Sequence, residues 1–492
     1  MSHDSSTLAL EASLRAGSLA SSGLLSATAI TAAASLINKV NQSDCETVRV
    51  MFTDQHGIMR GKTIVASALA SAFSAGLRVP STLLLKDTSH RTVFSVWSEH
   101  SGAGLDPMNG AGDIVLVPDA STFKRLPWAP HSAWILCDSA YKDGEAIEFD
   151  PRTVLKRSLL KLDRLNLNLV VGLEVEFHVF ELLDANREHV QTTMPGCAPK
   201  TRSLAHGYQF LTETRYAELE YLMDELRRYS QEMGLPVRSM EVEMGPSQFE
   251  FTFDPRSPLM HADNMIMFRT MVKEVCARKG LHATFMCRPK VENGSASGWH
   301  LHQSIIDATT GDNLFTPEAG QEPSPLALQW IAGLLKHASE ACLLTTPTVN
   351  GYKRYQPYQL APDRIQWGHD NRGAMIRALT KAGDSASRIE NRVADTTANP
   401  YYYFASQIVC GLAGIEAKLC APDAVETPYD SDATHLPENL GAAVEAFNNS
   451  ELIRAQLGDQ LVDYLVHIKR AEWRRYLSAI SQWEQDEYFS LY

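Results

Sequence analysis

The chain has 492 residues and a formal net charge of -13 at pH 7; 44% of the residues are hydrophobic and 21% are charged. This length exceeds the usual limit for a single hydrophobic core and predicts two to three globular domains. A mean hydropathy of -0.19 argues against a membrane protein. The acidic balance disfavours a general nucleic-acid or anionic-membrane surface, although a local basic site could still bind phosphate.

The cysteines and the N-terminal segment favour a cytoplasmic protein. The eight cysteines are scattered without a Cys-x-x-Cys pair, so we expect reduced thiols rather than a disulfide framework or a thiolate zinc site. Residues 8–37 are rich in Ala, Ser and Leu, but Glu11 and Arg15 interrupt them and no basic segment precedes them. This segment is too polar to span a bilayer, and residues 1–45 are predicted to form an N-terminal helix or arm.

A β-hairpin is predicted at the start of the folded part. Residues 46–66 alternate apolar and polar side chains on both sides of a His56-Gly57 turn, a pattern typical of two antiparallel strands. Further short strands are expected at residues 113–117 and 133–137. These elements predict a β domain over residues 46–148.

Helices dominate the rest of the chain. Asp150 as N-cap and Pro151 at the first helical position predict a helix over residues 153–165, so we place the domain boundary near residue 148. Longer helical segments are expected at residues 215–234, 261–279, 324–343, 400–419 and 437–480. Residues 149–492 are predicted to combine these helices with strands in a second, larger domain.

Two glutamates interrupt a very apolar strand of this second domain. Glu174 and Glu176 lie within residues 169–180, and alternate residues of a strand point to the same face. Neighbouring buried carboxylates are unstable unless a cation neutralises them, so the pair indicates a divalent metal. An edge strand with a solvated pair of glutamates is the alternative for this segment alone.

Two more segments carry polar side chains in a strand pattern. Glu243 and Glu250 lie on either side of a Gly-Pro-Ser turn, and Glu250 stands between phenylalanines, where a carboxylate needs a partner. His300 and His302 lie on one face of another predicted strand. Either histidine alone is more typical of a structural residue, but with the glutamates they form a candidate ligand set.

Arginines accompany a further glutamate near the end of this region. Arg372 and Arg377 flank a stretch of small residues, and Arg388, Glu390 and Arg392 share one face of an extended segment. In isolation, the Arg-x-Glu-x-Arg pattern favours a surface ion-pair ladder. Beside the other glutamates, it indicates Mg²⁺ or Mn²⁺ near guanidinium groups that bind phosphate or carboxylate. Phosphoryl transfer to or from a carboxylate needs both features.

These segments, in this order, resemble the glutamine synthetase superfamily from about residue 46 to the C-terminus. The motifs that carry the resemblance are Gly172-Leu173-Glu174-Val175-Glu176-Phe177, Glu243 to Glu250, Ala283-Thr284-Phe285-Met286 followed by His300-Leu301-His302-Gln303-Ser304, Asn371 to Arg377, and Arg388 to Tyr401. The resemblance implies an α+β fold with an N-terminal β-grasp domain and a C-terminal catalytic domain whose curved antiparallel sheet forms half a funnel. It also implies a homo-oligomer, commonly a dodecamer of two hexameric rings, with active sites shared between neighbouring subunits.

The resemblance also implies a role for individual residues. Two or more divalent cations per site are implied, with Glu176, Glu243 and Glu250 as ligands near glutamate and Glu174, His300 and Glu390 as ligands on the ATP side. The residues implied for binding the glutamate substrate are Arg354, Arg392 and Ala296. Those implied for ATP are His302, Ser304, Arg372, Arg377 and Arg388. The residues expected to act in catalysis are Arg372, Glu390 and Arg392.

The chain departs from glutamine synthetases proper at the ammonium site. Leu360 stands where those enzymes carry a flap glutamate that helps to deprotonate ammonium, and residues 86–97 replace a loop with an ammonium-binding aspartate. Both changes look like the branch that joins glutamate to organic amines, which includes the γ-glutamylpolyamine, γ-glutamylalkylamide and γ-glutamylanilide synthetases. The expected reaction is ATP-dependent and gives a γ-glutamylamide through γ-glutamyl phosphate.

The amine pocket is predicted to contain Leu360, Tyr355, Tyr358 and Trp97. An alkylammonium ion has a pKa of roughly 10 and must lose a proton before it attacks, whereas an arylamine is already neutral at pH 7. A pocket without a dedicated base therefore favours an apolar alkyl or aromatic amine. The alternatives are a γ-glutamylpolyamine synthetase, a glutamine synthetase that uses ammonium, and a noncatalytic structural member of the superfamily.

Regulation by adenylylation is not expected. The regulated enzymes use a tyrosine in an Asn-Leu-Tyr-Asp-Leu-Pro context, whereas Tyr429-Asp430 is followed here by residues 431–437 of a different sequence.

Overall fold

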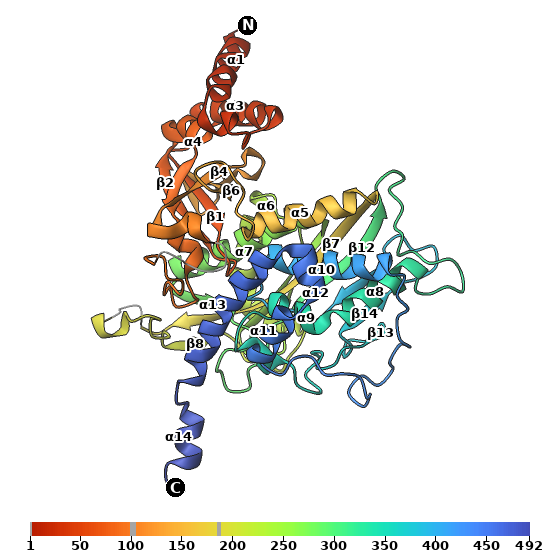
Figure 1. Ribbon diagram of the computed structural model, residues 1–492. Helices are drawn as coiled ribbons and strands as arrows, with labels where there is room; N and C mark the ends of the chain where they lie inside the picture. The colour runs from red at the N-terminus through yellow and green to blue at the C-terminus, as the bar shows by residue number, and fades with distance from the viewer. Residues whose placement is uncertain (1, 99–104, 185–187) are drawn as a thin grey trace.

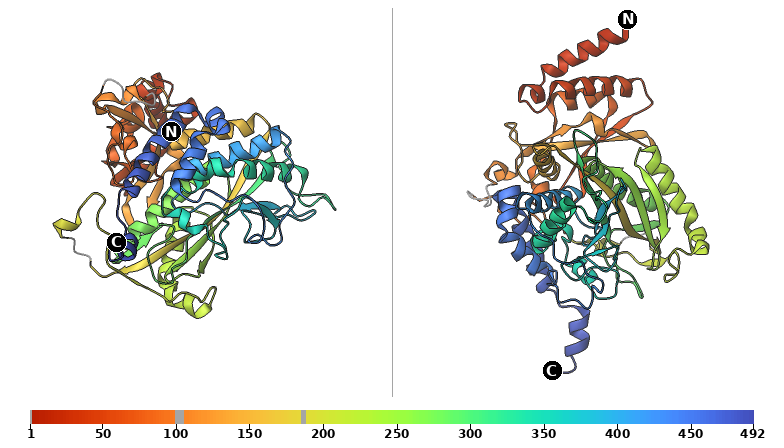
Figure 2. Two further views of the ribbon diagram at one scale, coloured as in Figure 1. Left: turned by 60° about the horizontal axis from the view of Figure 1, so that its bottom comes forward. Right: turned by 90° about the vertical axis from the view of Figure 1, so that its right-hand side faces the viewer.

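The computed structural model describes residues 2–98, 105–184 and 188–492. It contains two β-sheets and their helices, which confirms the predicted α+β class. The N-terminal helices lie at one end of the molecule, and the C-terminal helix projects from the other end (Figure 1). The right-hand view of Figure 2 shows the same arrangement.

The N-terminal segment forms helices that pack on one another. They are α1 (Ser2–Arg15), α2 (Ser18–Ser21), α3 (Ala27–Asn41) and α4 (Leu69–Ala75). Helix α3 buries Ile30, Ile37 and Val40, and it contacts both α1 and α4. Helices therefore occupy the segment for which the sequence predicted a helix or an arm.

The first sheet begins with the predicted hairpin. Its strands are β1 (Thr47–Thr53), β2 (Met59–Val65), β3 (Leu77–Pro80), β4 (Asp113–Pro118), β5 (Lys124–Leu126) and β6 (Ala129–Ala140), in the order β2-β1-β6-β4-β3 with β5 beside β6. Strands β1 and β2 are antiparallel and joined at the His56-Gly57 turn, as predicted. Strand β1 also pairs in parallel with β6, which the local pattern of side chains did not predict.

The second sheet carries the charged strands that the sequence singled out. Its strands are β7 (Leu167–Leu182), β8 (Thr201–Ser203), β9 (Val237–Val242), β10 (Gln248–Arg256), β11 (Leu281–Thr284), β12 (Trp299–Asp307), β13 (Trp367–His369), β14 (Ile376–Leu379) and β15 (Arg388–Asn391). The order is β13-β14-β15-β12-β7-β10-β9, with β8 and β11 paired to β7. Most neighbours are antiparallel, and β13 with β14 is a parallel pair.

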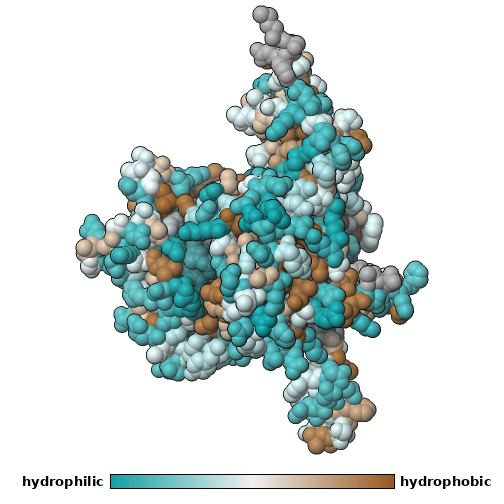
Figure 3. Space-filling view, turned by 180° about the vertical axis from the view of Figure 1, so that it is seen from behind, coloured by the Kyte–Doolittle hydropathy of each residue, from teal (hydrophilic) through white to brown (hydrophobic). Residues whose placement is uncertain are grey.

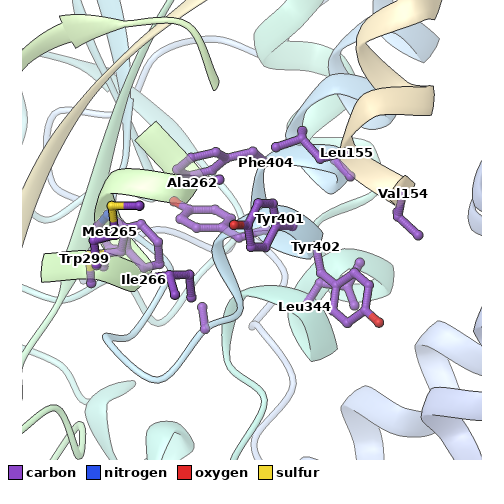
Figure 4. Packing of buried hydrophobic residues seen from close by; sticks show 14 of the residues in the cluster. Val154, Leu155, Ala262, Met265, Ile266, Trp299, Leu344, Tyr401, Tyr402 and Phe404 are labelled. Atoms are coloured by element: carbon purple, nitrogen blue, oxygen red, sulfur yellow. The ribbon is translucent and has the colours of Figure 1, made fainter. Parts of the chain in front are cut away.

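Helices cover one face of this sheet and bury its apolar side chains. They include α5 (Pro151–Asp163), α6 (Glu213–Glu232), α7 (Pro258–Arg278), α8 (Pro325–Lys336), α9 (Ala338–Thr345) and α10 (Pro400–Glu416). Leu155 of α5, Met265 of α7, Tyr401 of α10 and Trp299 of β12 belong to one core cluster that these elements share (Figure 4). The opposite face of the sheet is left for polar side chains.

Two long helices expected from the sequence are divided. The segment 324–343 breaks at His337, whose backbone leaves the helical conformation between α8 and α9. The segment 437–480 forms α11 (Leu440–Asn448), α12 (Glu451–Leu457) and α13 (Asp459–Leu477). Ser450 caps α12, and Gly458 separates α12 from α13 with a φ of 100°. Capping and glycine signals inside an apolar periodic pattern therefore ended these helices early.

The C-terminal end projects from the body. Helix α14 (Gln482–Tyr488) and the residues after it expose large apolar side chains, namely Trp483, Phe489, Leu491 and Tyr492. Hydrophobic atoms gather at the tip of this projection (Figure 3). Among the described residues, every helix is too short or too polar to cross a membrane.

A buried polar network holds β12 and β15 against the helices. Gln407 of α10 accepts hydrogen bonds from Gln303 of β12 at 3.0 Å and from Asn391 of β15 at 2.7 Å. Trp330 of α8 donates its indole N–H to Gln303 at 3.0 Å. Because each member is buried, these bonds fix the register of two strands whose other face carries polar residues.

Replacing Gln407 with leucine should destabilise the protein. Gln407→Leu leaves two buried amide donors without an acceptor, at about 1–3 kcal/mol for each in free energy of unfolding. The measurement is the midpoint of denaturant unfolding. Gln485→Leu, on the exposed C-terminal helix, is the control and should unfold with the wild type. Equal midpoints for Gln407→Leu and the wild type would contradict the importance of this network.

Candidate active site

A large cavity lies over the polar face of the second sheet. Its volume is about 1550 Å³, and strands β7, β9, β10 and β12 form its floor. On β7, the odd-numbered residues from Leu169 to Val179 are buried in the core, while Gly172, Glu174 and Glu176 line the cavity. The period of two along the strand therefore separates an apolar core face from a charged cavity face.

The strand register places the predicted residues in one band across the sheet. The cross-strand pairs are Glu250–Glu176, Thr252–Glu174, Glu174–His300, His302–Glu390 and Glu390–Arg377. Directly paired residues have Cβ atoms about 4.5–5.5 Å apart. Residues that are far apart in the sequence are thus neighbours across the strands, as the ligand hypothesis requires.

Carboxylates crowd one half of the band. Burial, and then the neighbouring Glu243, raise the pKa of Glu176 to about 8. Burial, and then contact with Glu243 and Glu176, raise the pKa of Glu250 well above its usual value. Among the described residues, Glu176 accepts its hydrogen bonds from neutral groups, the Gln248 amide at 2.9 Å and the Gly298 N–H at 3.1 Å. The charges of Arg354 and Arg392 oppose the rise in its pKa without reversing it, so this half has too little positive charge for the ionised form.

Histidines stabilise the carboxylate of Glu174 in the other half. The Glu174 oxygens lie 3.2 Å from His300 Nδ1 and 2.8 Å from His302 Nε2. Arg354 approaches His300 Nε2 at 3.4 Å and Arg388 approaches His302 Nδ1 at 3.1 Å. Because arginine only donates, each imidazole must donate its remaining N–H to Glu174. Burial alone would raise the pKa of Glu174, but these bonds outweigh it and lower the pKa.

Glu390 lies at the centre of the arginine side. Its side chain is fully buried and forms ion pairs with Arg377, at 3.0 Å, and with Arg392. Burial opposes ionisation, yet Arg392 and then His300 hold the pKa of Glu390 at about 2. Ligand atoms of Glu174, His302 and Glu390 all lie within 4.8 Å of one another. His302, predicted for ATP, is thus a second candidate ligand beside His300, whose Nδ1 lies 3.6 Å from Glu390.

The other predicted binding residues also reach the cavity. Arg354 is buried and donates to the backbone carbonyls of residues 392 and 393 at 2.8 and 3.2 Å. Arg372 and Ala296 line the cavity, and Arg392 donates to the Arg372 carbonyl at 3.0 Å. Ser304 lines it as well and donates to the Ser387 carbonyl at 2.9 Å. The structure therefore brings these positions together, while their roles stay predictions.

Two of the four residues predicted for the amine pocket lie elsewhere. Tyr358 and Leu360 line the cavity and are exposed. Tyr355 does not line the cavity, because its ring is buried and its hydroxyl bonds to Thr346 and to the carbonyl of residue 393. Trp97 is 82% exposed and lies outside the residues that line the cavity of its own chain, so its role stays a prediction.

Sequence reasoning missed further charged residues of the cavity. Glu241 pairs with Glu250 across β9 and β10, and its Oε2 atom is buried with no hydrogen-bond partner among the described residues. Glu241 and Glu243 repeat the spacing of Glu174 and Glu176, which was a usable signal. Four basic residues also line the cavity, Arg238, Arg288, Lys290 and Lys353. Arg238 lies on β9 and Lys353 in a short 3-10 helix (Gly351–Arg354), whereas Arg288 and Lys290 lie in a loop, where no periodicity marks the direction of a side chain.

The donor set fits divalent cations. Carboxylates with one imidazole are ligands that Mg²⁺ and Mn²⁺ accept, and a buried carboxylate oxygen without a partner, as in Glu241, needs a cation or a donor nearby. The arginines opposite these acids can bind phosphate or carboxylate oxygens. Together the two halves of the site suit a reaction in which negative charge on phosphate must be neutralised.

A protein-family model matches most of the chain. Residues 148–488 match the model described as "Glutamine synthetase, catalytic domain". A γ-glutamylanilide synthase of Acinetobacter sp is 38% identical to this chain over 479 residues, which cover 94% of the chain and 96% of the relative. A glutamate–isopropylamine ligase of Pseudomonas sp is 28% identical, with 92% and 96% covered.

Solved structures have the same fold. A structure described as a GmaS/ADP complex is 27% identical to this chain, with a TM-score of 0.77. The match covers 92% of this chain and 99% of the other.

Metal binding should release protons from the crowded carboxylates. Without a cation, Glu176 has a pKa of about 8 and is mostly protonated at pH 7, so a cation must displace that proton. Affinity for Mn²⁺ should rise by about tenfold per pH unit for each displaced proton as the pH approaches 8, and fall as the pH drops. Calorimetry in buffers of different ionisation enthalpy measures the proton count.

Glu176→Gln is the matched control for this titration, because it cannot release that proton. The variant should release fewer protons than the wild type on binding Mn²⁺. A binding enthalpy of the wild type that does not depend on the buffer would contradict the assignment.

Proposed function

Because the chain belongs to the glutamine synthetase family, we propose that it joins the γ-carboxylate of L-glutamate to an organic amine with the hydrolysis of ATP. The products are a γ-glutamylamide, ADP and phosphate. The observation that carries this function is the band of cross-strand pairs, which brings four glutamates (Glu174, Glu176, Glu250 and Glu390), two histidines and Arg377 together across one sheet. The similarity to two glutamate–amine ligases over more than nine-tenths of the chain supports it.

The proposed reaction has two steps. The γ-carboxylate of glutamate attacks the γ-phosphorus of ATP, and ADP leaves. The amine nitrogen then attacks the γ-carbonyl carbon of γ-glutamyl phosphate, loses a proton and expels phosphate. Arg354 and Arg392 would hold glutamate by its carboxylates, and Arg372 would offset the charge of the phosphoryl group in flight. His302, Ser304, Arg377 and Arg388 would hold ATP from the arginine side of the cavity.

The proposed cofactor is Mg²⁺ or Mn²⁺, with two or more ions per site. Glu176, Glu243 and Glu250 would hold one ion, and Glu174 and Glu390 with His300 or His302 would hold the other. The cations would supply the positive charge that orients the phosphates and neutralises the transferred group. The raised pKa values of Glu176 and Glu250 support a cation in the first position, since no arginine or lysine is hydrogen-bonded to them among the described residues.

The proposed amine is apolar and, above all, aromatic. Leu360 lines the cavity and brings no acidic side chain to the position of the flap glutamate. An amine that is already neutral at pH 7 therefore has an advantage. Tyr358 offers an aromatic ring in the same cavity. The similarity to a γ-glutamylanilide synthase agrees with an arylamine.

Polyamines are disfavoured by the charge of the same wall. Arg288, Lys290 and Lys353 line the cavity, and Arg288 donates to the Lys353 carbonyl at 3.1 Å, close to the segment that carries Tyr358 and Leu360. A second ammonium group on the substrate would meet these like charges. A neutral arylamine would not.

Assembly and location remain part of the proposal. We propose a dodecamer of two hexameric rings in the cytoplasm. The exposed apolar side chains at the C-terminal projection support an oligomer, because large apolar groups at a chain end favour burial against another copy. The domains are proposed as an N-terminal helical segment over residues 1–45, a β-grasp domain over 46–148 and a catalytic domain over 149–492.

Phosphate release with a panel of amines tests the function. With ATP, Mg²⁺ and glutamate, aniline should give the highest kcat/KM, isopropylamine a lower one, and putrescine a value at least about tenfold below aniline, from one unfavourable charge contact. Glu176→Ala should release no phosphate with any amine. Phosphate release with ammonium alone would identify the protein as a glutamine synthetase. A preference for putrescine would identify it as a polyamine ligase, and no release with any amine would favour a noncatalytic protein.

Restoring an acid in the flap should improve ammonium as a substrate. Leu360→Glu places a base where ammonium needs one, so kcat/KM for ammonium should rise by about tenfold or more while kcat/KM for aniline falls. Leu360→Gln has the same shape without the base and should show no such gain. Equal behaviour of the two variants would contradict the role assigned to the missing acid.

A further inference from the structure

We propose that Tyr429 is a positioning residue for the amine step: its ring holds Tyr358 in the cavity and joins the loop of residues 356–362 to the turn that carries Arg372. This inference rests on the proposed function for its substrate. It assigns a role to a tyrosine that the sequence singled out and that neither the metal ligands nor the phosphate contacts use.

The loop of residues 356–362 needs support from outside. Tyr358 and Leu360 have φ values of 61° and 52°, in the left-handed region that side chains other than glycine seldom adopt. Both side chains are also exposed to the cavity. Residues held in such conformations persist only where their surroundings fix them, and they gather at binding sites.

Two residues provide that support. Arg392 donates to the Leu360 carbonyl at 3.1 Å. The Tyr429 hydroxyl lies 3.5 Å from the Ala361 carbonyl, and its ring lies 4.9 Å from the Tyr358 ring at an interplanar angle of 44°. Tilted aromatic pairs at this distance attract each other beyond the area that they bury. Tyr429 itself does not line the cavity, so it acts on the amine through Tyr358.

The other side of Tyr429 packs on the turn that follows Arg372. A Cβ atom at Gly373 would lie 3.2 Å from a ring carbon of Tyr429 and 2.6 Å from Cγ of Pro428. Glycine is therefore required at position 373 for this close approach. The turn is therefore the fixed surface on which the Tyr429 ring rests, and a change of that ring acts mainly on Tyr358.

The segment that carries Tyr429 is anchored to the same region. Asn371 donates to the Glu426 carbonyl at 3.0 Å, Gln366 donates to the Pro428 carbonyl at 2.7 Å, and the Val425 N–H donates to the Trp367 carbonyl at 2.9 Å. These bonds make residues 425–429 a fixed support for the Tyr429 ring. A positioning residue requires such a support on one side and a loop that needs to be held on the other.

The inference makes the Tyr358–Tyr429 pair a determinant of aryl selectivity. A ring that lies against the cavity can stack on an aromatic amine, and its orientation is set by the ring behind it. An alkylamine gains less from that orientation. Loss of the Tyr429 ring should therefore weaken the binding of aniline more than the binding of isopropylamine, and it should leave glutamate binding largely unchanged.

Tyr429→Leu tests this role by its effect on separate substrates. KM for aniline should rise by roughly 3- to 10-fold, whereas KM for ATP and for glutamate should stay within about twofold. Tyr429→Phe keeps the ring and should stay close to the wild type for aniline. Tyr221→Leu, an exposed tyrosine on α6, is the surface control. Tyr358→Leu with Tyr429→Leu should be no worse than Tyr358→Leu alone, because the second change removes a contact already lost.

A second measurement does not depend on activity. Chymotrypsin cleaves after exposed tyrosine and leucine, so cleavage after Tyr358 and Leu360, followed by mass spectrometry, reports how firmly the loop is held. Cleavage should be at least about threefold faster in Tyr429→Leu than in Tyr429→Phe or the wild type.

Several outcomes would overturn the inference. An unchanged KM for aniline in Tyr429→Leu, an equal rise for all three substrates, or a Phe variant as impaired as the Leu variant would each do so. A wild type that releases no phosphate with any amine would instead refute the proposed function, and the cleavage rates would still decide whether Tyr429 holds the loop.

Discussion

Repulsion between glutamates that face one cavity is the constraint on which the site depends. Glu174, Glu176, Glu241 and Glu250 come from three neighbouring strands, Glu243 follows the end of β9, and all five line the same space. Like charges on paired strands destabilise a sheet unless something neutralises them. The apolar core on the other face of the sheet supplies the stability that lets the strands carry these acids. The fold therefore holds the acids together, and a bound cation would offset the repulsion between them.

The fold neutralises these acids in two different ways. On the side of Glu390, arginines and histidines from β12, β14 and β15 already offset the negative charge, so the pKa values of Glu174 and Glu390 are lowered. On the side of Glu176, the hydrogen bonds that the described residues give to the carboxylate come from neutral donors, and its pKa is raised although Arg354 and Arg392 oppose the rise. This asymmetry matches a reaction in which phosphate needs fixed cations on one side and a removable one on the other.

Much of the site could be predicted from the sequence, because strand alternation is a strong signal. Charged residues two apart in an apolar run, as in Glu174 and Glu176, had to share a face, and the registers place them opposite Glu250 and His300. Glu241 carried the same signal beside Glu243 and was passed over. Tyr355 was assigned to the pocket from its place in the sequence. Side chains in a loop do not alternate between two faces, and the Tyr355 ring is buried in the core.

Other features could not be derived from local patterns. The parallel pair of β1 and β6 depends on how segments distant in the sequence meet, and so does the position of Trp97 outside the lining of the cavity of its own chain. The support of Tyr358 by Tyr429 joins two loops with no periodicity. Sequence patterns located the side chains on regular strands, whereas the loops that complete the site required the structure.

The most direct test of the central claim is a crystal structure with Mn²⁺ and ADP, using the anomalous signal of manganese to locate the ions. Two ions should appear over the second sheet, one contacted by Glu176, Glu243 and Glu250 and the other by Glu174, Glu390 and an imidazole of the His300–His302 pair, with the nucleotide phosphates between them and Arg377. Ions bound elsewhere, or these side chains turned away from the manganese peaks, would contradict the account.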